Sequence, residues 1–341
     1  MHQPGSRYSR QIRFGPIGEA GQASLQNASV LICGCGALGT TIAERLARAG
    51  VGRLRIVDRD WVEESNLQRQ ALFTQQDADQ SKPKAVAAAE AIRGINPMLE
   101  VEALVEDIHF ENMASLAEGC DILLDGTDNF ETRFLINDYC IQESKPWVHG
   151  GCLGASGQGL TILPGESACF RCLVPDLPDR EAMETCDSAG VLGSAIGLVA
   201  SWQSGEALKL LSGNVDQVCD GLWVMDSWTN DFRIVKLRQN SNCRCCVHKE
   251  LPFLSGDIRT QATVLCGKNA VQIDSPGASH VALGEIADRL SAVGDVQQNA
   301  YFVRVRMPEH TLTLFRGGRT VVEGTTSESE AKAISTRVLG G

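Results

Sequence analysis

A glycine-rich turn constrains the fold of this chain more than any other feature of its sequence. The segment "GCGALG" (34–39) follows the apolar run "ASVLICG" and opens the helical pattern "ALGTTIAERLARAG" (37–50). Its spacing, G-x-G-x-x-G, is typical of a strand–turn–helix unit that binds a nucleotide. Gly34 permits the tight turn, Gly36 lets phosphate approach the backbone, and Gly39 lets the helix pack closely on the strand. We therefore expect a nucleotide at the start of this helix, where free N–H groups attract an anion.

Short apolar runs alternate with helical patterns through the first half of the chain. We expect strands at 28–34, 53–58, 99–106, 120–126 and 145–151, and helices at 37–50, 82–97 and 129–143. This alternation predicts an α/β fold with a Rossmann-like, mostly parallel sheet, right-handed crossovers and helices on both faces. Ligands of such sheets bind beyond the carboxyl ends of the strands.

The second half of the chain follows a different pattern. "LWVMDS" and "DFRIVKL" predict a pair of strands that extends the sheet in antiparallel fashion. The run "LPFLSGDI" (251–258) is typical of a linker, so we expect a first domain over 1–255 and a second over 256–341. The second is expected to be a small α+β module.

The composition argues against several classes of protein. With 43% hydrophobic and 21% charged residues, the chain is typical of a soluble globular protein. Its net charge of −11 argues against a nucleic-acid-binding surface. The most apolar stretch contains Gln203, Glu206 and Lys209, so it is expected to be a buried helix, and no membrane segment is predicted. Thirteen cysteines without an apolar signal segment favour reduced thiols and a cytoplasmic location.

The glycine turn does not distinguish NAD from ATP, but the residues after the second expected strand favour ATP. Asp58 ends that strand and suits the hydroxyls of a ribose, the alternative being a loop cap. The segment "SNLQRQ" then supplies Asn66, Arg69 and Gln70, and Lys84 follows. A planar guanidinium and a compact ammonium suit a triphosphate that loses pyrophosphate. Each residue alone is usually a solvated surface residue or a cap, but together they favour adenylyl transfer.

A further carboxylate follows the fourth expected strand. Asp128 lies in "GTDN", directly beyond 120–126. Carboxylate and phosphate oxygens are the ligands that Mg²⁺ prefers, so Asp128 is a candidate magnesium ligand. The alternative is an ordinary turn or cap residue.

Two C-x-x-C pairs predict a metal site. "CFRC" supplies Cys169 and Cys172, and "CRCC" supplies Cys243 and Cys246. Four thiolates form a closed tetrahedral set, which is typical of structural zinc. Because the pairs lie far apart in the sequence, the ion would join two distant segments. Cys245 does not complete a C-x-x-C pair and is interpreted as a bystander. The alternative is four buried, reduced cysteines.

An ordered set of motifs resembles one known family. "RYSRQI", "GCGALG", "VDRD", "SNLQRQ", "KPK", "GTDN", "CFRC", "TCDSAG" and "CRCC" occur in the order found in the ThiF/MoeB/HesA family. These bacterial relatives of ubiquitin-activating enzymes adenylate the C-terminal glycine of a ubiquitin-like sulfur carrier protein. The resemblance covers residues 7–246.

The resemblance implies a role for each candidate residue. Asp58 would bind the ribose, with Asp60 near it, and Asp128 would bind Mg²⁺. The phosphate ligands would be Asn66, Arg69, Gln70 and Lys84. Arg10, in "RYSRQ", is similar to an arginine that reaches across a dimer interface into the partner's ATP site. Ala37 stands where the family often has glycine, and its methyl group narrows the loop slightly. The four cysteines match the zinc ligands of the family.

Cys186 stands apart from the other cysteines. It lies in the Pro- and Asp-rich stretch 173–190, just before a helix, where a thiol can have a lowered pKa. The resemblance places it on a loop that crosses over the active site, where it would form a thioester or acyl-disulfide with the carrier. The alternative is a loop cysteine that adenylation does not need.

The resemblance implies an ATP-dependent adenylyltransferase. Its substrate would be a ThiS-like or MoaD-like carrier ending in Gly-Gly, in thiamine or molybdopterin biosynthesis. A homodimer and a sulfur donor such as a cysteine desulfurase are implied as well. One rival function, an NAD-dependent oxidoreductase, leaves Arg69, Lys84 and Cys186 unexplained. The other, an inactive zinc-stapled binding module, is opposed by candidate residues at every ATP position.

Overall fold

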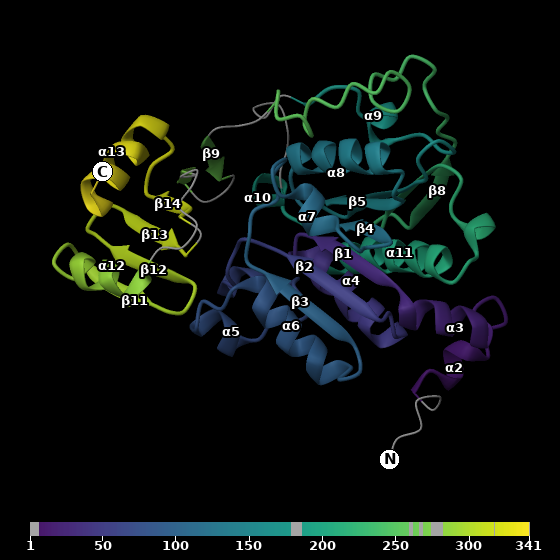
Figure 1. Cartoon of the computed structure of the whole chain (residues 1–341), viewed down its shortest axis with the longest axis horizontal. Coiled ribbons are helices and arrows are strands. Elements are labelled where there is room, and N and C mark those ends of the chain that lie inside the picture. The colour runs from purple at the N-terminus through teal and green to yellow at the C-terminus, as the bar shows by residue number, and fades with distance from the viewer. Residues whose placement is uncertain are drawn as a thin grey trace. The chain divides into compact units, whose positions relative to one another are not determined.

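The chain divides into two compact units, Met1–Ile258 and Arg259–Gly341. A computed structural model describes residues 7–178, 186–258, 262–265, 269–273, 282–316 and 318–340 (Figure 1). The side chains of residues 186, 187 and 262–265 lie outside that description. Each unit has its own sheet and its own apolar core.

The first unit contains an eight-stranded sheet with the order β3-β2-β1-β4-β5-β6-β7-β8. The strands are β1 (Ser29–Cys33), β2 (Arg53–Val57), β3 (Glu100–Leu104), β4 (Ile122–Asp125), β5 (Trp147–Leu153), β6 (Ser156–Ile162), β7 (Leu222–Asp226) and β8 (Asp231–Val235). Strands β1 to β5 are parallel, and β5 to β8 are antiparallel. This confirms the Rossmann-like parallel sheet with an antiparallel extension.

Helices cover both faces of this sheet, as predicted (Figure 1). They are α2 (Ser9–Ile12), α3 (Gly18–Asn27), α4 (Ala37–Ala49), α5 (Gln75–Asp79), α6 (Lys84–Ile95), α7 (Met113–Ala117), α8 (Phe130–Glu143), α9 (Phe170–Leu173), α10 (Cys186–Ala189) and α11 (Gly193–Leu211). Among the described residues, short 3₁₀ helices span Glu64–Asn66 and Val215–Gln217. Helix α4 ends where the sequence predicts, because Gly50 takes the left-handed conformation that closes a helix.

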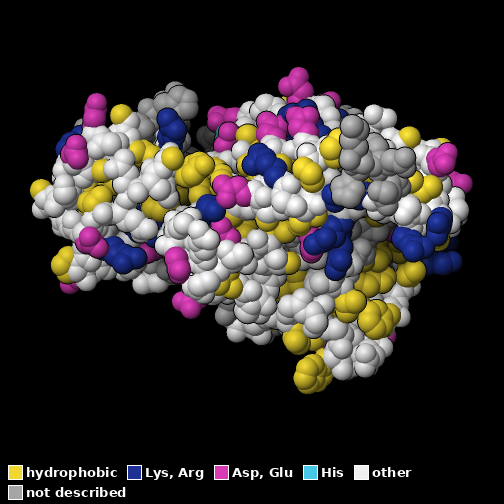
Figure 2. Space-filling model, turned by 90° about the horizontal axis from the view of Figure 1, so that it is seen from below, with side chains coloured by type: hydrophobic (Ala, Val, Ile, Leu, Met, Phe, Trp, Pro, Cys, Tyr) yellow, Lys and Arg dark blue, Asp and Glu magenta, His cyan; other side chains and the backbone are white. Residues whose placement is uncertain are grey.

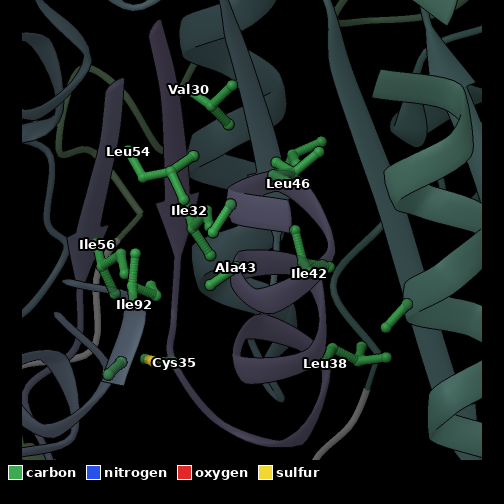
Figure 3. Close-up of a cluster of buried hydrophobic side chains, with 14 of the residues drawn as sticks. Val30, Ile32, Cys35, Leu38, Ile42, Ala43, Leu46, Leu54, Ile56 and Ile92 are labelled. Atoms are coloured by element: carbon green, nitrogen blue, oxygen red, sulfur yellow. The ribbon is translucent and has the colours of Figure 1, made fainter. Parts of the chain in front are cut away.

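Strand β1 is buried on both faces, and each face packs against a different layer of helices. Val30 and Ile32 belong to the core formed with α4, α6 and α11, whereas Leu31 and Cys33 belong to the core formed with α7 and α8. This alternation follows from the two-residue period of a strand. Figure 3 shows Ile32 pointing toward helix α4, from which Ala43 faces the sheet. Full burial of a Val, Leu or Ile side chain, as at Val30, Leu31 and Ile32, stabilises the fold by about 1.5–3 kcal/mol.

Strand β6 is not anticipated from the sequence. Its segment, "SGQGLTI", contains Gly157 and Gly159, which weaken the pattern of a strand. A Cβ atom on Gly159 would collide with the ring of Trp202, and one on Gly157 would collide with Val199. The glycines therefore let helix α11 pack directly on the sheet. At the far edge, β8 exposes Phe232 and Ile234, an apolar edge of the kind that proteins usually cover.

The second unit is a small α+β module. Its antiparallel sheet has the order β11-β12-β13-β14-β10-β9. The elements are β9 (Ala262–Leu265), β10 (Ala270–Ile273), α12 (Leu283–Leu290), β11 (Asp295–Gln298), β12 (Phe302–Arg306), β13 (Thr311–Phe315), β14 (Thr320–Glu323) and α13 (Glu328–Leu339). Leu290 of α12 and Ile334 of α13 pack with Val303 and Val305 on one face of this sheet.

Within the described residues, no helix combines the length and the apolar character that crossing a bilayer requires. On the face drawn in Figure 2, Lys and Arg side chains are interspersed with acidic ones.

Candidate active site

The glycine turn meets the end of strand β4 backbone against backbone. Gly34 has a φ of +88°, and a Cβ atom placed on it would lie 2.8 Å from the carbonyl oxygen of Gly126. A Cβ atom on Gly39 would collide with the Gly34 carbonyl. At Gly36, the N-cap of α4, a Cβ atom would have its nearest neighbour 3.9 Å away. The turn thus leaves open space at the positive end of α4, beside the loop that follows β4.

Asp58 holds the glycine turn from the end of β2. Its Oδ2 accepts a 2.6 Å hydrogen bond from the backbone N–H of Cys35, and its Oδ1 accepts one of 2.7 Å from the N–H of Asp60. Burial raises the pKa of Asp58, and Lys84 partly opposes that rise. The structure therefore places Asp58 at the glycine turn, within reach of a nucleotide bound at the start of α4.

Lys84 is the centre of a cluster of charges at the carboxyl ends of β2 and β4. It is buried, and its Nζ lies 3.2 Å from Oδ2 of Asp60. Burial lowers the pKa of Lys84, but the carboxylates of Asp60, Asp58 and Asp128 raise it by more, so its net shift is upward. Lys84 therefore stays charged at neutral pH, and the structure brings it together with three of the predicted carboxylates.

Arg59 belongs to the same cluster and was not among the residues predicted from the sequence. Its Nη1 lies 2.6 Å from Oδ2 of Asp107. Burial lowers the pKa of Arg59, whereas Asp107, Asp60 and Asp128 raise it by more. Its position inside the motif "VDRD", next to the end of a strand, is the signal that could have identified it.

The segment "SNLQRQ" lies against the first turns of α4 and α11. The N–H of Ala71 donates to Oγ1 of Thr40 on α4, and Gly193, at the start of α11, approaches the backbone of Arg69. Asn66 is buried, and its Oδ1 accepts a 3.1 Å bond from Glu63, which precedes the short 3₁₀ helix. Within the described residues, the buried Oε1 of Gln70 has no hydrogen-bond partner.

Only part of the Arg69 guanidinium is hydrogen-bonded within the protein. Its Nη1 donates to the backbone oxygen of Ser65 at 2.8 Å, and the side chain is half-buried. The remaining N–H groups can bind an anion, as a planar guanidinium does with phosphate.

Asp128 extends from a loop that a buried ion network holds. Asp128 itself is exposed, and its neighbour Asn129 caps helix α8 by accepting a 2.8 Å bond from Thr132. Behind them, the fully buried Asp125 accepts bonds from Thr127, through the backbone N–H at 2.9 Å and Oγ1 at 2.7 Å. The carboxylate of Asp128 is therefore presented on a well-supported loop, close enough to Lys84 to raise the pKa of that lysine.

Arg133 and His149 complete the network, and neither was predicted from the sequence. Arg133 Nε lies 2.9 Å and His149 Nδ1 2.7 Å from the same carboxylate oxygen of Asp125. Burial raises the pKa of Asp125, but Arg133, His149 and Thr127 lower it by more, to about 2. Burial also lowers the pKa of His149, so at neutral pH its Nδ1 carries the proton that it donates to Asp125.

Replacing Asp125 with Asn should destabilise the first unit by about 3–5 kcal/mol, because Arg133 would keep a buried charge without its counter-ion. The Asp125 pKa is lowered in the folded state, so its charge stabilises the fold above about pH 4, where an unfolded aspartate ionises, and this stabilisation is lost as the pH falls toward 2. Urea unfolding between pH 2 and 7 measures both effects. Equal stability of the variant and the wild type at pH 7 would contradict this account.

The structure brings the two cysteine pairs together. The Sγ atoms of Cys169 and Cys172 are 3.8 Å apart, and those of Cys169–Cys243 and Cys172–Cys246 are each 3.6 Å apart. All four lie within 4.8 Å of one another. Tetrahedral zinc with Zn–S bonds of about 2.3 Å needs sulfurs about 3.8 Å apart, so these residues fit the ion.

Thiol chemistry supports the same conclusion. The hydrogen bond to Cys169, together with burial, raises the pKa of Cys172 to about 12, and burial raises the pKa of Cys246 to about 11. Thiols with raised pKa values are thiolates at neutral pH only beside a cation, which a divalent metal supplies.

Cys245 lies outside the four-cysteine cluster, as its spacing indicates, but residues of helix α8 hold it in place. It is fully buried, and its thiol donates to Oδ1 of Asp138 at 3.3 Å. Asn137 Nδ2 donates to the same sulfur at 3.1 Å. Its neighbours come from helix α8, which no local sequence pattern around Cys245 indicates.

Arg10 lies far from the glycine turn within its own chain. It is exposed on α2, and the next residue, Gln11, donates to the carbonyl of Ala49 at the C-terminal end of α4. The glycine turn lies at the opposite end of α4, and the 13 residues of this helix span about 20 Å. The structure therefore does not bring Arg10 to the other candidates.

Cys186 begins helix α10, and its side chain lies outside the described residues. The chain after it is held to the end of β5. The N–H of Gly154 donates to Gly190 at 3.0 Å, and Leu192 donates back to Gly154 at 2.8 Å. Helix α11 then starts beside Arg69, so the backbone that follows Cys186 runs past the candidate site.

Together, the fold and the site define an α/β protein with a glycine turn of the nucleotide-binding type, a cation–carboxylate cluster and four cysteines that could hold a metal ion. The model of the ThiF family matches residues 8–247, and the chain belongs to this family.

Curated relatives share much of the sequence. The chain is 42% identical over 339 residues to the sulfur carrier protein ThiS adenylyltransferase of Bacillus subtilis (strain 168), and the match covers 98% of this chain and 99% of that protein. It is 39% identical over 240 residues to the SAMP-activating enzyme E1 of Haloferax volcanii, with 70% of this chain and 88% of that enzyme covered.

Solved structures agree with the fold. MccB of E. coli, in a crystal structure with MccA-N7isoASN, superposes with a TM-score of 0.64 over 72% of this chain and 75% of that chain. At 20% sequence identity, this likeness shows the fold alone.

Proposed function

We propose that this chain is an ATP-dependent adenylyltransferase that activates the C-terminal glycine of a ubiquitin-like sulfur carrier protein. The observation that supports this best is the match of 42% identity to a ThiS adenylyltransferase, because it covers both proteins almost from end to end. A ThiS-like carrier, and hence thiamine biosynthesis, is our first choice for the same reason. A MoaD-like carrier of molybdopterin biosynthesis is the alternative.

The proposed site binds ATP between the start of α4 and the ends of β2 and β4. The glycine turn and Asp58 take the phosphate and ribose end of the nucleotide. Lys84 and Arg69 neutralise the phosphates, with the amides of Asn66 and Gln70 beside them. Asp128 is the free carboxylate for Mg²⁺, which when bound would neutralise charge on the leaving pyrophosphate.

Positioning and charge neutralisation account for the reaction. The carboxylate of the terminal glycine attacks the α-phosphorus, the bond to the bridging oxygen breaks, and pyrophosphate leaves with its magnesium. The attacking carboxylate is already ionised, so the step needs no general base. A sulfur donor such as a cysteine desulfurase then supplies the sulfur. Cys186 is proposed to react with the acyl-adenylate in that later step. Its thiolate would displace AMP and form a thioester, or its persulfide, formed by sulfur transfer from the donor's own persulfide, would displace AMP and form an acyl-disulfide.

Adenylyl transfer can be distinguished from hydride transfer by pyrophosphate exchange. With ATP, Mg²⁺ and a carrier ending in Gly-Gly, the protein should exchange labelled pyrophosphate into ATP, and NAD should have no effect. ThiS-like and MoaD-like carriers, supplied separately, identify the substrate, and a carrier without its last glycine is the control. Saturable NAD binding with hydride transfer, and no exchange with either carrier, would favour an oxidoreductase instead.

Arg10 supports a homodimer with shared sites. It lies at the far end of α4 from its own glycine turn, so we propose that it acts in the ATP site of the partner subunit. The described cysteines are free thiols, which fits the cytoplasmic location that we propose for the enzyme.

A mixing experiment tests the shared site. The variants Arg10→Ala and Arg69→Ala should each be inactive, but a heterodimer of the two keeps one intact site. Equal mixing should therefore restore about a quarter of the wild-type exchange, by random pairing of subunits in a two-fold dimer. Native mass spectrometry confirms that the subunits exchange. No recovery in confirmed heterodimers would mean that each site is complete within one chain.

A further inference from the structure

One residue of helix α8 contacts both segments that supply the metal cysteines. Asn137 is fully buried, and its Oδ1 accepts a 2.9 Å bond from the backbone N–H of Phe170, which directly follows Cys169. Its Nδ2 donates to Cys245, which lies between Cys243 and Cys246. A single amide thus joins two segments that are far apart in the chain.

Asp138 reinforces this connection. Its Oδ1 accepts from the Cys245 thiol at 3.3 Å, and its Oδ2 accepts from the N–H of Phe253 at 3.1 Å. Both side chains of α8 are buried, and buried polar groups of this kind are costly to leave without partners. Side chains that orient metal ligands commonly change metal affinity when they are replaced.

The previous turn of the same helix holds the loop of Asp128. Arg133 lies one helical turn before Asn137, so the two side chains lie on one side of α8. Arg133 donates through Nη2 to the carbonyl of Thr127 at 2.8 Å, besides its ion pair with Asp125. The metal segments and the nucleotide loop are therefore held by consecutive turns of one buried helix.

Aromatic contacts form a second link between the first cysteine pair and the network around Asp125. Phe170, inside the first cysteine pair, lies with its ring centroid 4.8 Å from that of His149, and His149 is bonded to Asp125. Phe170 also packs edge-on against Phe134 of α8, at 5.5 Å between ring centroids. Displacement of the first cysteine pair would therefore disturb a partner of Asp125 as well as the helix that carries Arg133.

We propose that helix α8 couples the metal cluster to the nucleotide site. Asn137 and Cys245 are positioning residues for zinc, and Arg133 transmits the state of the cluster to the loop that ends in Asp128. The second half of this proposal rests on the proposed function. Coupling between two binding sites is reciprocal, so a bound nucleotide should raise the affinity for zinc by the same factor as bound zinc raises the affinity for the nucleotide.

The test measures zinc release from the full-length protein into a chromophoric chelator, which needs no catalytic activity. Asn137→Ala and Cys245→Ala should release zinc about 10–100 times faster than the wild type, in line with other residues that orient metal ligands. Cys245→Ser keeps both a donor and an acceptor and should behave nearly as the wild type. Gln142→Ala, an exposed change on the same helix, is the matched control.

The coupling is tested on the wild type, so it does not depend on how a variant folds. Saturating Mg²⁺ and a non-hydrolysable ATP analogue should slow zinc release at least about five-fold, within the usual range of coupling between sites. Unchanged release from Cys245→Ala and Asn137→Ala would overturn the positioning roles. Calorimetric binding of the nucleotide without any effect on zinc release would overturn the coupling. Absence of nucleotide binding would instead remove the proposed function and the coupling together, while the release rates of the variants still decide the positioning roles.

Discussion

Pyrophosphate exchange should fall at least about 100-fold when either Arg69 or Asp128 is replaced with Ala, since removing a group that stabilises developing charge commonly costs that much. Arg69→Ala removes the guanidinium that we assign to the phosphates of ATP. Asp128→Ala removes the exposed carboxylate that we assign to Mg²⁺. Exchange at saturating ATP and carrier measures the loss, and a magnesium titration separates the two variants, because only Asp128→Ala should shift the metal requirement.

Both substitutions should leave the fold intact. Asp128 is exposed, and Arg69 is half-buried with one bond to a backbone carbonyl, so each change should alter stability by about 0.5 kcal/mol or less. Arg48→Ala is the matched control, because Arg48 is an exposed arginine of α4 whose ion pair is with Glu44. Exchange within about three-fold of the wild type in a folded Arg69→Ala protein would exclude the assigned phosphate role, because a lost charge-assisted bond is worth more than that.

The parallel half of the sheet could be predicted because its signals are local. Its strands are short runs rich in Val, Ile and Leu, and the turn at Gly34 and the end of α4 at Gly50 have glycines where φ is positive. Strand β6 could not be predicted in this way. Any larger residue in place of its glycines would collide with Trp202 or Val199, which belong to a helix much further along the chain.

In the candidate site, too, the residues with local sequence signals could be predicted and the others could not. Asp58, Lys84 and Asp128 lie in recognisable motifs, and the structure brings these three charges together. The network that supports them was not predictable from local pattern. Arg133 and His149 stand in helix and strand segments with no motif around them, and only the fold places both beside Asp125.

The cysteines show what spacing can and cannot predict. C-x-x-C spacing identified the four residues whose sulfurs converge, because two cysteines so spaced can bind one ion from a single turn. The same rule left Cys245 out of the set, in agreement with the structure. The contacts of Cys245 with Asn137 and Asp138 could not be predicted, because those residues are distant in the chain and reach it only through the fold.

Loss of the zinc cluster should have the largest effect on stability. The wild-type protein should contain about one zinc per chain, and Cys172→Ser should lose most of it, because serine is a poor ligand for this ion. Binding free energy at such a site is also folding free energy. If losing the ion removes at least about 4 kcal/mol, the melting temperature of a unit of this size should fall by about 10 °C or more.

Cys219→Ser separates the metal from the mere loss of a thiol. Cys219 is a half-buried free cysteine of the same unit, outside the cluster, so its replacement should leave zinc content and melting temperature nearly unchanged. Elemental analysis of protein purified without chelator gives the metal content, and calorimetry gives the melting temperature. If the wild type is well folded and contains no metal, the cluster is four reduced thiols, and the segments around Cys169 and Cys243 are then held by hydrogen bonds and packing without an ion, including the bonds of Asn137 and Asp138.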